Sequence, residues 1–306
     1  MKKLKIVLSL PGDTSYLHEQ AEAAKAAAER LGVELHVLYA EGDPIIQSQQ
    51  LLEILQSRST PLPDGIIIEP ASSTGLPQVA AAAVDAGIGW VISNASVDYL
   101  GALRGKSKVP VFTVSQDHVE IGRIQGRQMG ALLPQGGSVL YLRGPSTNSL
   151  ACKRTEGMES TKPGNIQLKT LNMMWNEDSA CNALRSWLRL STVRAAGTQL
   201  ISSQGSDFIT AARKAFQAHS ENSERNKWLS VPHVGTGTLR QTKPLVDKRV
   251  LHAAAVTSAT ADTALDMLVS AIRNGSKPPE CTFVPSSSYP SLEELAARKP
   301  ERPGGS

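Results

Sequence analysis

The stretch "DGIIIEPASS", residues 64 to 73, places three consecutive isoleucines between a turn and a polar ending. An apolar run of this kind, bounded by a Pro/Asp/Gly turn, predicts a strand buried on both faces, as in a parallel sheet. The run stops at Glu69, and Ser72 and Ser73 follow it. Ligands of open parallel sheets bind beyond the carboxyl ends of strands. The polar ending therefore marks a candidate site.

Strand and helix patterns alternate on both sides of this stretch. Apolar runs predict strands at residues 4–10, 34–40, 65–69, 89–95 and 111–115, with helical periodicity between them. The alternation restarts at 138–144 and continues at 166–174, 199–204, 231–235 and 249–259, before a helix at 261–272 and a strand at 281–287. This rhythm predicts an α/β fold with two successive parallel-sheet units.

Composition narrows the class of protein. The chain has 306 residues, of which 41% are hydrophobic and 20% charged, and this is ordinary for a globular protein. Its net charge of +4 comes from scattered Lys and Arg, so neither nucleic acid nor an anionic membrane is indicated as a partner. No segment approaches the roughly 20 apolar residues of a membrane span.

The sequence holds no recognisable cofactor or metal motif. "GALRGKS" at 101–107 lacks the glycine spacing of a phosphate loop and is interpreted as a basic surface loop. The six histidines show no metal-ligand spacing. The cysteines Cys152, Cys181 and Cys281 are widely spaced, which indicates free thiols. We expect neither a cofactor nor a metal.

The amino-terminal segment is interpreted as a first strand. The apolar stretch from Leu4 to Leu10 is short and runs into Pro11 and Gly12 with no small-residue cleavage site. We therefore expect a cytoplasmic protein from the sequence as printed. A periplasmic location is the alternative, because a sequence trimmed of its leader would look the same.

The residues at the predicted strand ends share one chemistry. They are mostly neutral hydrogen-bonding groups, which suit the binding of a small polar molecule better than its conversion. They are residues 11–16, Glu69, Ser72, Ser73, Asn94, Gln116, Asp117, residues 143–148, Trp175, Asn176, residues 204–207 and residues 235–238. Individually, Ser72, Ser73 and Asp117 are also typical helix caps.

Several segments in this order resemble the type I periplasmic binding proteins for sugars, which share their fold with lactose-repressor-type ligand-binding cores. They include "KIVLSL", "DGIIIEPASS", "VSQDHVEIGRIQGRQM", "SVLYLRGPSTNSLACKRTEGMES" and "VGTGT". The resemblance implies two doubly wound lobes joined by a three-segment hinge that closes on ligand. The lobes would comprise 1–115 with 257–281 and 116–256 with 282–290, leaving 291–306 as a polar tail.

The resemblance also implies where the ligand binds. The predicted ligand-binding residues are Asp13, Thr14, Tyr16, Leu17, Glu69, Asn94, Asp117, Asn148, Cys152, Trp175, Gln204, Asp207 and Gly237. Tyr16 would stack on a sugar face, and Glu69 would accept hydrogen bonds from hydroxyls or pair with a cationic group. Sugar binders commonly have an Asp where this chain has Asn94.

The second lobe departs from the family pattern. The usual arginine ahead of "EG" falls on Cys152, leaving Arg154, the usual Asn falls on Gly205, and the usual Asp falls on Gly237. These losses remove charged and bidentate contacts. Either the ligand differs or neighbouring residues replace those contacts.

We expect a non-enzymatic binding protein for a small polar, sugar-like ligand, acting as a monomer or homodimer. Its partner would be a transporter permease or a signalling protein. Two alternatives stay open. One is an α/β enzyme that uses Glu69, Asp117 or His118 as acid or base. The other is the ligand-binding core of a transcriptional regulator without its DNA-binding segment.

Overall fold

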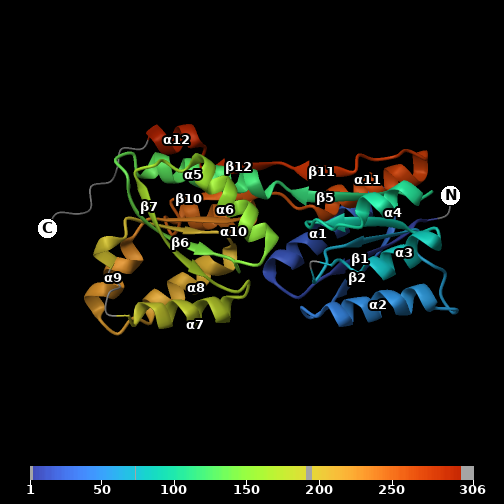
Figure 1. Cartoon of the computed structure of the whole chain (residues 1–306), viewed down its shortest axis with the longest axis horizontal. Coiled ribbons are helices and arrows are strands. Elements are labelled where there is room, and N and C mark those ends of the chain that lie inside the picture. The colour runs from blue at the N-terminus through green and yellow to red at the C-terminus, as the bar shows by residue number, and fades with distance from the viewer. Residues whose placement is uncertain (1–2, 73, 191–194, 298–306) are drawn as a thin grey trace. The chain divides into compact units, whose positions relative to one another are not determined.

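The computed structural model describes residues 3–72, 74–190 and 195–297 (Figure 1). The chain forms two compact units. Unit 1 comprises Met1–Gln116 and Ala259–Val284, and unit 2 comprises Asp117–Ser258 and Pro285–Ser306. The chain thus passes between the units three times. The sequence predicts these breaks after residues 115, 256 and 281, slightly earlier in each case.

Unit 1 is built on a parallel sheet of six strands. Their order is β11-β5-β4-β3-β1-β2, and every neighbouring pair is parallel. The strands are β1 (Lys5–Leu10), β2 (Glu34–Tyr39), β3 (Gly65–Ile68), β4 (Gly89–Ser93), β5 (Val111–Gln116) and β11 (Cys281–Val284). The helices are α1 (Ser15–Leu31), α2 (Pro44–Gln56), α3 (Pro77–Asp85), α4 (Leu100–Lys106) and α11 (Ala261–Asn274).

The three isoleucines of β3 confirm the predicted burial on both faces. Each is fully buried. Ile67 packs into the core formed with α1 and α11, and Ile66 and Ile68 pack into the core formed with α2 and α3. Helices therefore cover both faces of the sheet. Because β1 lies between β2 and β3, the strand order reverses at β1, which is where ligands of such sheets bind.

Unit 2 has a similar sheet, in which only the edge pair β10–β12 is antiparallel among the described strands. Its six strands have the order β12-β10-β9-β8-β6-β7, so the reversal point is at β6. The strands are β6 (Gly137–Arg143), β7 (Ile166–Asn172), β8 (Leu200–Ser203), β9 (His233–Thr238), β10 (Ala253–Thr257) and β12 (Ser286–Tyr289). The helices are α5 (His118–Leu132), α6 (Ser149–Thr161), α7 (Glu177–Leu188), α8 (Ser206–Gln217), α9 (Asn222–Ser230), α10 (Leu239–Asp247) and α12 (Leu292–Ala297), with a 3₁₀ turn at Ala195–Gly197.

Two glycines let α5 and α6 approach closely. A Cβ on Gly122 would collide with the carbonyl of Arg154, and a Cβ on Gly157 would collide with the carbonyl of Val119. Glycine is required where two backbones come this close. The approach brings Arg154 of α6 against His118, the first residue of α5.

The carboxyl-terminal part differs from the sequence prediction. The expected single strand at 281–287 is two strands: β11 joins the sheet of unit 1, and β12 pairs antiparallel with β10 in unit 2. Residues 282–284, predicted in the second lobe, therefore belong to unit 1. Proline at 285, which cannot donate to a ladder, separates the two strands.

Several predicted loops are helical. The predicted polar tail contains α12, whose Leu295 is buried, and residues 298–306 lie outside the described residues. The segment "GALRGKS", interpreted as a loop, lies mostly in α4. Helices α9 and α10 were also not predicted, since α9 has little amphipathic pattern and α10 contains Pro244.

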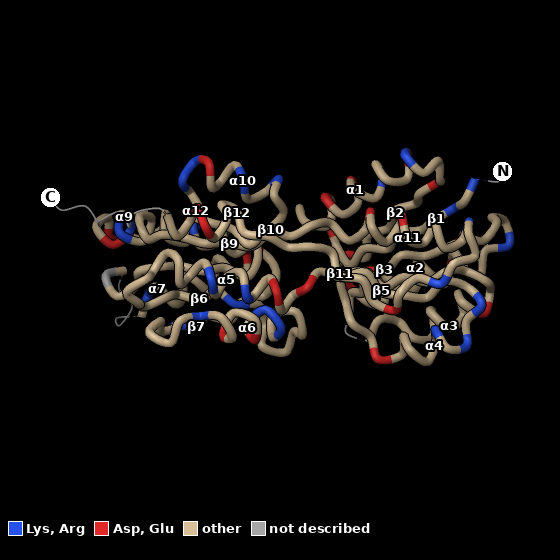
Figure 2. Tube along the Cα trace, turned by 90° about the horizontal axis from the view of Figure 1, so that it is seen from above, with Lys and Arg blue, Asp and Glu red and all other residues tan. Residues whose placement is uncertain are grey.

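Charge and hydropathy of the folded chain agree with the composition. Lys and Arg are scattered among Asp and Glu over the elements of both units (Figure 2). None of the helices in the described ranges is long and apolar enough to cross a membrane. The three cysteines are free thiols, and only Cys181 is buried.

Candidate functional site

Four polar side chains meet at the carboxyl end of the unit 1 sheet. Tyr16 follows β1, Glu69 follows β3, Asn94 follows β4, and Gln116 ends β5. The Asn94 Nδ2 group donates to the Tyr16 hydroxyl at 3.2 Å and to Glu69 Oε1 at 3.3 Å. Gln116 Nε2 donates to the same hydroxyl at 3.2 Å. We call these four residues the unit 1 cluster.

The backbone of Asn94 explains why this residue type ends β4. Its φ is +53°, in the left-handed region. Asparagine tolerates this region better than most residues because its short amide side chain can form hydrogen bonds with the nearby backbone. The side chain is buried. Asn94 therefore supplies both the turn and two of the hydrogen bonds of the cluster, those to Tyr16 and Glu69.

Glu69 is the acidic member of the unit 1 cluster. One oxygen, Oε1, accepts the hydrogen bond from Asn94. The other, Oε2, is shielded from solvent and has no hydrogen-bond partner among the described residues. Burial raises the pKa of Glu69 to about 7, against the opposing effect of the Asn94 hydrogen bond. The carboxyl group can therefore change its protonation state near neutral pH.

A buried glutamine fixes the loop that carries Glu69. Gln47 of α2 donates from Nε2 to Ser9 Oγ at 3.1 Å and to the Glu69 carbonyl at 2.9 Å. Its Oε1 accepts from the Ala71 N–H at 2.8 Å. Since Gln47 is fully buried, its hydrogen bonds fix the position of the chain at the end of β3. No sequence motif points to this residue.

The other predicted residues after β1 have local roles. Thr14 caps α1, with its hydroxyl accepting from the Leu17 N–H at 3.4 Å, and the Leu17 side chain lies in the hydrophobic core. Asp13 pairs with His18, and both side chains are mostly exposed. The structure therefore brings Tyr16, but not the Asp13 carboxylate, into the unit 1 cluster. Ser73 lies outside the described residues.

In unit 2, a buried arginine lies at the reversal point of the sheet. Arg154 Nε donates to His118 Nδ1 at 3.3 Å, and Nη1 donates to the Gln204 carbonyl. Its guanidinium carbon lies 5.9 Å from the centre of the Trp175 ring. Burial, with Arg154 as a second cause, lowers the pKa of His118 to about 2. His118 is therefore neutral and accepts the hydrogen bond.

Gln204 organises the loops around this arginine. Its Nε2 donates to the Tyr141 hydroxyl at 2.7 Å and also to the Ala151 carbonyl and Thr155 Oγ1, both at 3.1 Å. Its Oε1 accepts from the Gly144 N–H at 3.0 Å. Because its amide is fully used and the residue is fully buried, Gln204 supports the site and does not present its side chain to a ligand.

Trp175 explains one departure from the family pattern. Its ring stacks on Phe208 with centroids 5.0 Å apart. A Cβ on Gly144 would collide with this ring, and a Cβ on Gly205 would lie 3.0 Å from Trp175 Cζ3. An asparagine side chain at 205 would thus begin in tight contact with this ring, which would have to shift by a few tenths of an ångström.

The remaining predicted residues of unit 2 lie at helix starts and strand ends. Asp117 and Asn148 cap α5 and α6. Asp207 lies in the first turn of α8, where burial and then Glu177 raise the pKa of its carboxyl group. Cys152 is exposed and accepts from Arg143 Nη2 at 3.3 Å. A Cβ at Gly237 would lie 2.9 Å from Gln241 Oε1, so the end of the Gln241 side chain would have to move to admit a side chain there.

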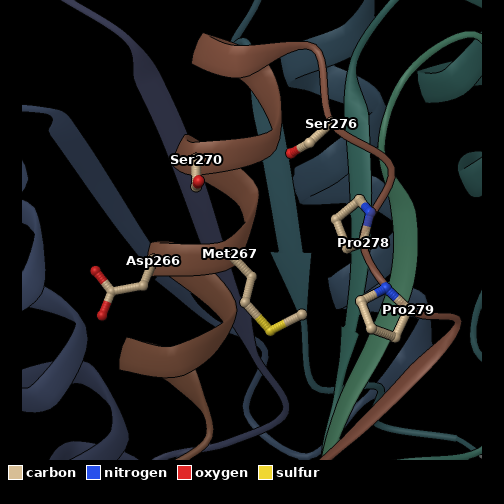
Figure 3. Close-up of a pocket in the computed structure, with 6 residues that line it drawn as sticks. All are labelled: Asp266, Met267, Ser270, Ser276, Pro278 and Pro279. Atoms are coloured by element: carbon tan, nitrogen blue, oxygen red, sulfur yellow. The ribbon is translucent and has the colours of Figure 1, made fainter.

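A hollow elsewhere in unit 1 is a poor candidate for this site. It is lined by Asp266, Met267, Ser270, Ser276, Pro278 and Pro279, between α11 and the loop that enters β11 (Figure 3). This loop leads to the amino end of β11, away from the strand ends that carry the cluster. Asp266, its acidic residue, is paired with Arg30 at 2.8 Å.

A sequence profile described as a periplasmic binding protein domain matches residues 6–277. The chain belongs to this family. The resemblance predicted from the sequence is thereby confirmed, and the family is one of binding proteins. No curated protein sequence matches the chain.

Solved structures of periplasmic binding proteins have the same fold. A galactofuranose binding protein is 18% identical, with 96% of this chain and 97% of that chain covered and a TM-score of 0.77. A solute binding protein of an ABC transporter from Actinobacillus succinogenes, with bound D-allose, is 16% identical, with 96% and 99% covered and a TM-score of 0.79. The fructose binding periplasmic domain of a hybrid two component system is 18% identical, with 96% and 93% covered and a TM-score of 0.74.

The members of the unit 1 cluster were only partly predictable. The sequence predicts Tyr16, Glu69 and Asn94 as ligand-binding residues and places Gln116 only at a strand end. In unit 2, the retained Arg154 is the sequence signal for the site, and the sequence suggests its partner His118 only as an acid or base. No group of three or more His, Cys, Asp or Glu within the described ranges could hold a metal ion.

Proposed function

We propose that this chain binds a small polyhydroxylated ligand, a sugar or polyol, through the unit 1 cluster. The observation that carries the proposal is the convergence of four polar side chains on the strand-reversal point of unit 1. Tyr16 and Gln116 offer groups suited to hydroxyls, and Glu69 offers a strong acceptor.

The chemistry of the relatives supports this ligand class. The structures compared above are described as binding galactofuranose, D-allose and fructose. A solute binding protein from Mycobacterium smegmatis with the same fold is described with bound glycerol. These ligands share vicinal hydroxyl groups, which match clustered acceptors and amides at strand ends.

The partner is proposed on the same basis. One compared protein is a solute binding protein of an ABC transporter, and another is the fructose binding periplasmic domain of a hybrid two component system. We propose that the ligand-bound form of this chain is recognised by a transporter permease or a signalling protein. Acid or base catalysis by Glu69 is disfavoured, since the family consists of binding proteins.

The proposal is tested by calorimetry with purified protein and a panel of pentoses, hexoses and polyols. At least one compound should bind, and Tyr16→Ala should weaken its binding, because the hydroxyl shared by Asn94 and Gln116 is lost. Ser276→Ala, an exposed residue of the hollow in Figure 3, should leave binding unchanged. Equal binding by Tyr16→Ala and Ser276→Ala would contradict the proposal.

A further inference from the structure

Glu69 has an acidic side chain with no cation beside it. In the part of the chain that the structure describes, its only side-chain hydrogen bond comes from the neutral amide of Asn94, and no Lys, Arg or His forms an ion pair with it. Burial and that hydrogen bond are the causes that set its pKa. The charge of an ionised Glu69 is therefore not compensated within unit 1.

An uncompensated carboxylate at low solvent exposure is unfavourable. Its ionised form loses hydration, and only a hydrogen-bond donor or a positive charge can replace it. Both N–H groups of Asn94 Nδ2 are already used, one on Tyr16 and one on Glu69, so this amide cannot serve Oε2 as well. The missing donor has to come from elsewhere.

Glu69 lies at the strand end where the ligand is proposed to bind. The residue as a whole is half-buried, and its Oε2 is shielded in this conformation. The two oxygens of an ionised carboxyl group are equivalent, and each can accept more than one hydrogen bond. A ligand donor can therefore share the oxygen that accepts from Asn94, or reach the other one after a change of the side-chain torsions.

We propose that the ligand of the unit 1 cluster is a hydroxylated molecule that carries a protonated primary amine, such as an amino sugar or an aminopolyol, with the ammonium group bound to Glu69. This inference rests on the proposed function and deepens it. The ammonium supplies both the missing donors and the missing charge, and hydrogen bonds between charged groups are about twice as strong as neutral ones. The hydroxyls of the ligand then bind the remaining members of the cluster.

The test compares amines with their neutral parents by calorimetry at pH 7. The pairs are D-glucosamine with D-glucose, D-galactosamine with D-galactose, and 1-amino-1-deoxy-D-glucitol with D-glucitol. N-acetyl-D-glucosamine serves as a control, because acetylation removes the charge and keeps the ring. The isosteric variant Glu69→Gln is measured alongside, with its melting curve as a check of folding.

At least one amine should bind about tenfold or more tightly than its neutral parent, and the advantage should fall below about threefold in Glu69→Gln. The N-acetyl control should lose the advantage in the wild-type protein, so the test holds even if the variant folds poorly. If neutral parents bind as tightly as the amines, the inference is wrong while the proposed function stands. Binding of no compound of either kind would overturn both.

Discussion

Asn94 donates to Glu69 across the ends of two neighbouring strands, with 3.3 Å between Asn94 Nδ2 and Glu69 Oε1. Sugar binders of this family commonly place the carboxylate at the position of Asn94. In this chain the carboxylate follows β3 and the amide follows β4. The site therefore has one acid and one amide donor, and one oxygen of the acid, Glu69 Oε2, has no hydrogen-bond donor among the described residues.

Two substitutions of Asn94 distinguish its role in the backbone turn from its role as a hydrogen-bond donor. Asn94→Gly should keep the left-handed backbone and weaken ligand binding by about 1 to 3 kcal/mol, because buried partners lose their donor. Asn94→Ala should weaken binding equally and also lower the free energy of unfolding by about 1 kcal/mol more than Asn94→Gly, since alanine disfavours that backbone region. Calorimetry and denaturant unfolding measure the two effects. Equal stability of both variants would argue against the backbone role.

The protonation of Glu69 should make stability depend on pH. Its pKa rises from 4.5 to about 7 on folding, so the folded state holds the proton more tightly than the unfolded state. Its favourable contribution is complete below pH 4.5 and disappears as pH rises through 7. Glu69→Gln should therefore be more stable than the wild-type protein at pH 8, by about 1 to 3 kcal/mol.

The comparison that checks this prediction is urea unfolding at pH 4.5 and pH 8. The stability difference between variant and wild-type protein should be small at pH 4.5 and should grow between the two values. A difference that is constant with pH would mean that the Glu69 carboxyl group titrates normally.

Because α5 and α6 approach closely, a larger residue at their contact should strongly destabilise the protein. Gly122→Ala should destabilise the protein by about 2 to 4 kcal/mol, because its Cβ collides with the Arg154 carbonyl and the backbone has to shift. Gly105→Ala is the matched control, since this helical glycine of α4 has open space around it. The control should be neutral or up to about 1 kcal/mol more stable. Thermal unfolding of both variants decides the matter.

Trp175 and Gly205 should be energetically coupled. Gly205→Asn crowds the Trp175 ring and should cost about 1 kcal/mol. In a Trp175→Ala background the same substitution should be neutral or stabilising, because α8 lacks a side-chain cap and asparagine is a favourable one. A double-mutant cycle of unfolding free energies measures this coupling. Additive effects would show that Trp175 is not the reason for glycine at 205.

The fold could be predicted from the sequence where a single hydrophobic pattern extends over a whole helix or strand. The isoleucines of β3 predict a strand covered on both faces, and the structure places them in two different cores. The sequence prediction treats the segment at 281–287 as one strand, although Pro285 separates its two halves. Their assignment to different sheets depends on long-range pairing with β5 and β10, which local pattern does not carry.

The site was predictable only to the level of strand ends. Position after a strand identified Tyr16, Glu69 and Asn94, since topology alone brings such residues together. It could not identify Gln47, whose hydrogen bonds to Ser9 and Glu69 join three elements. Position after a strand also could not show that Gln204 uses its side-chain amide for hydrogen bonds inside unit 2. A glutamine at a strand end can either bind a ligand or support the neighbouring loops.

The most direct test of solute binding at the unit 1 cluster is a thermal-shift measurement on wild-type protein and Asn94→Gly with the sugars, polyols and amines named above. A ligand at about 100 times its Kd should stabilise the wild-type protein by about 2.7 kcal/mol by mass action. We expect at least one compound to raise the Tm of the wild-type protein and to raise that of Asn94→Gly far less. Equal shifts in both proteins, or no shift in either, would contradict the account.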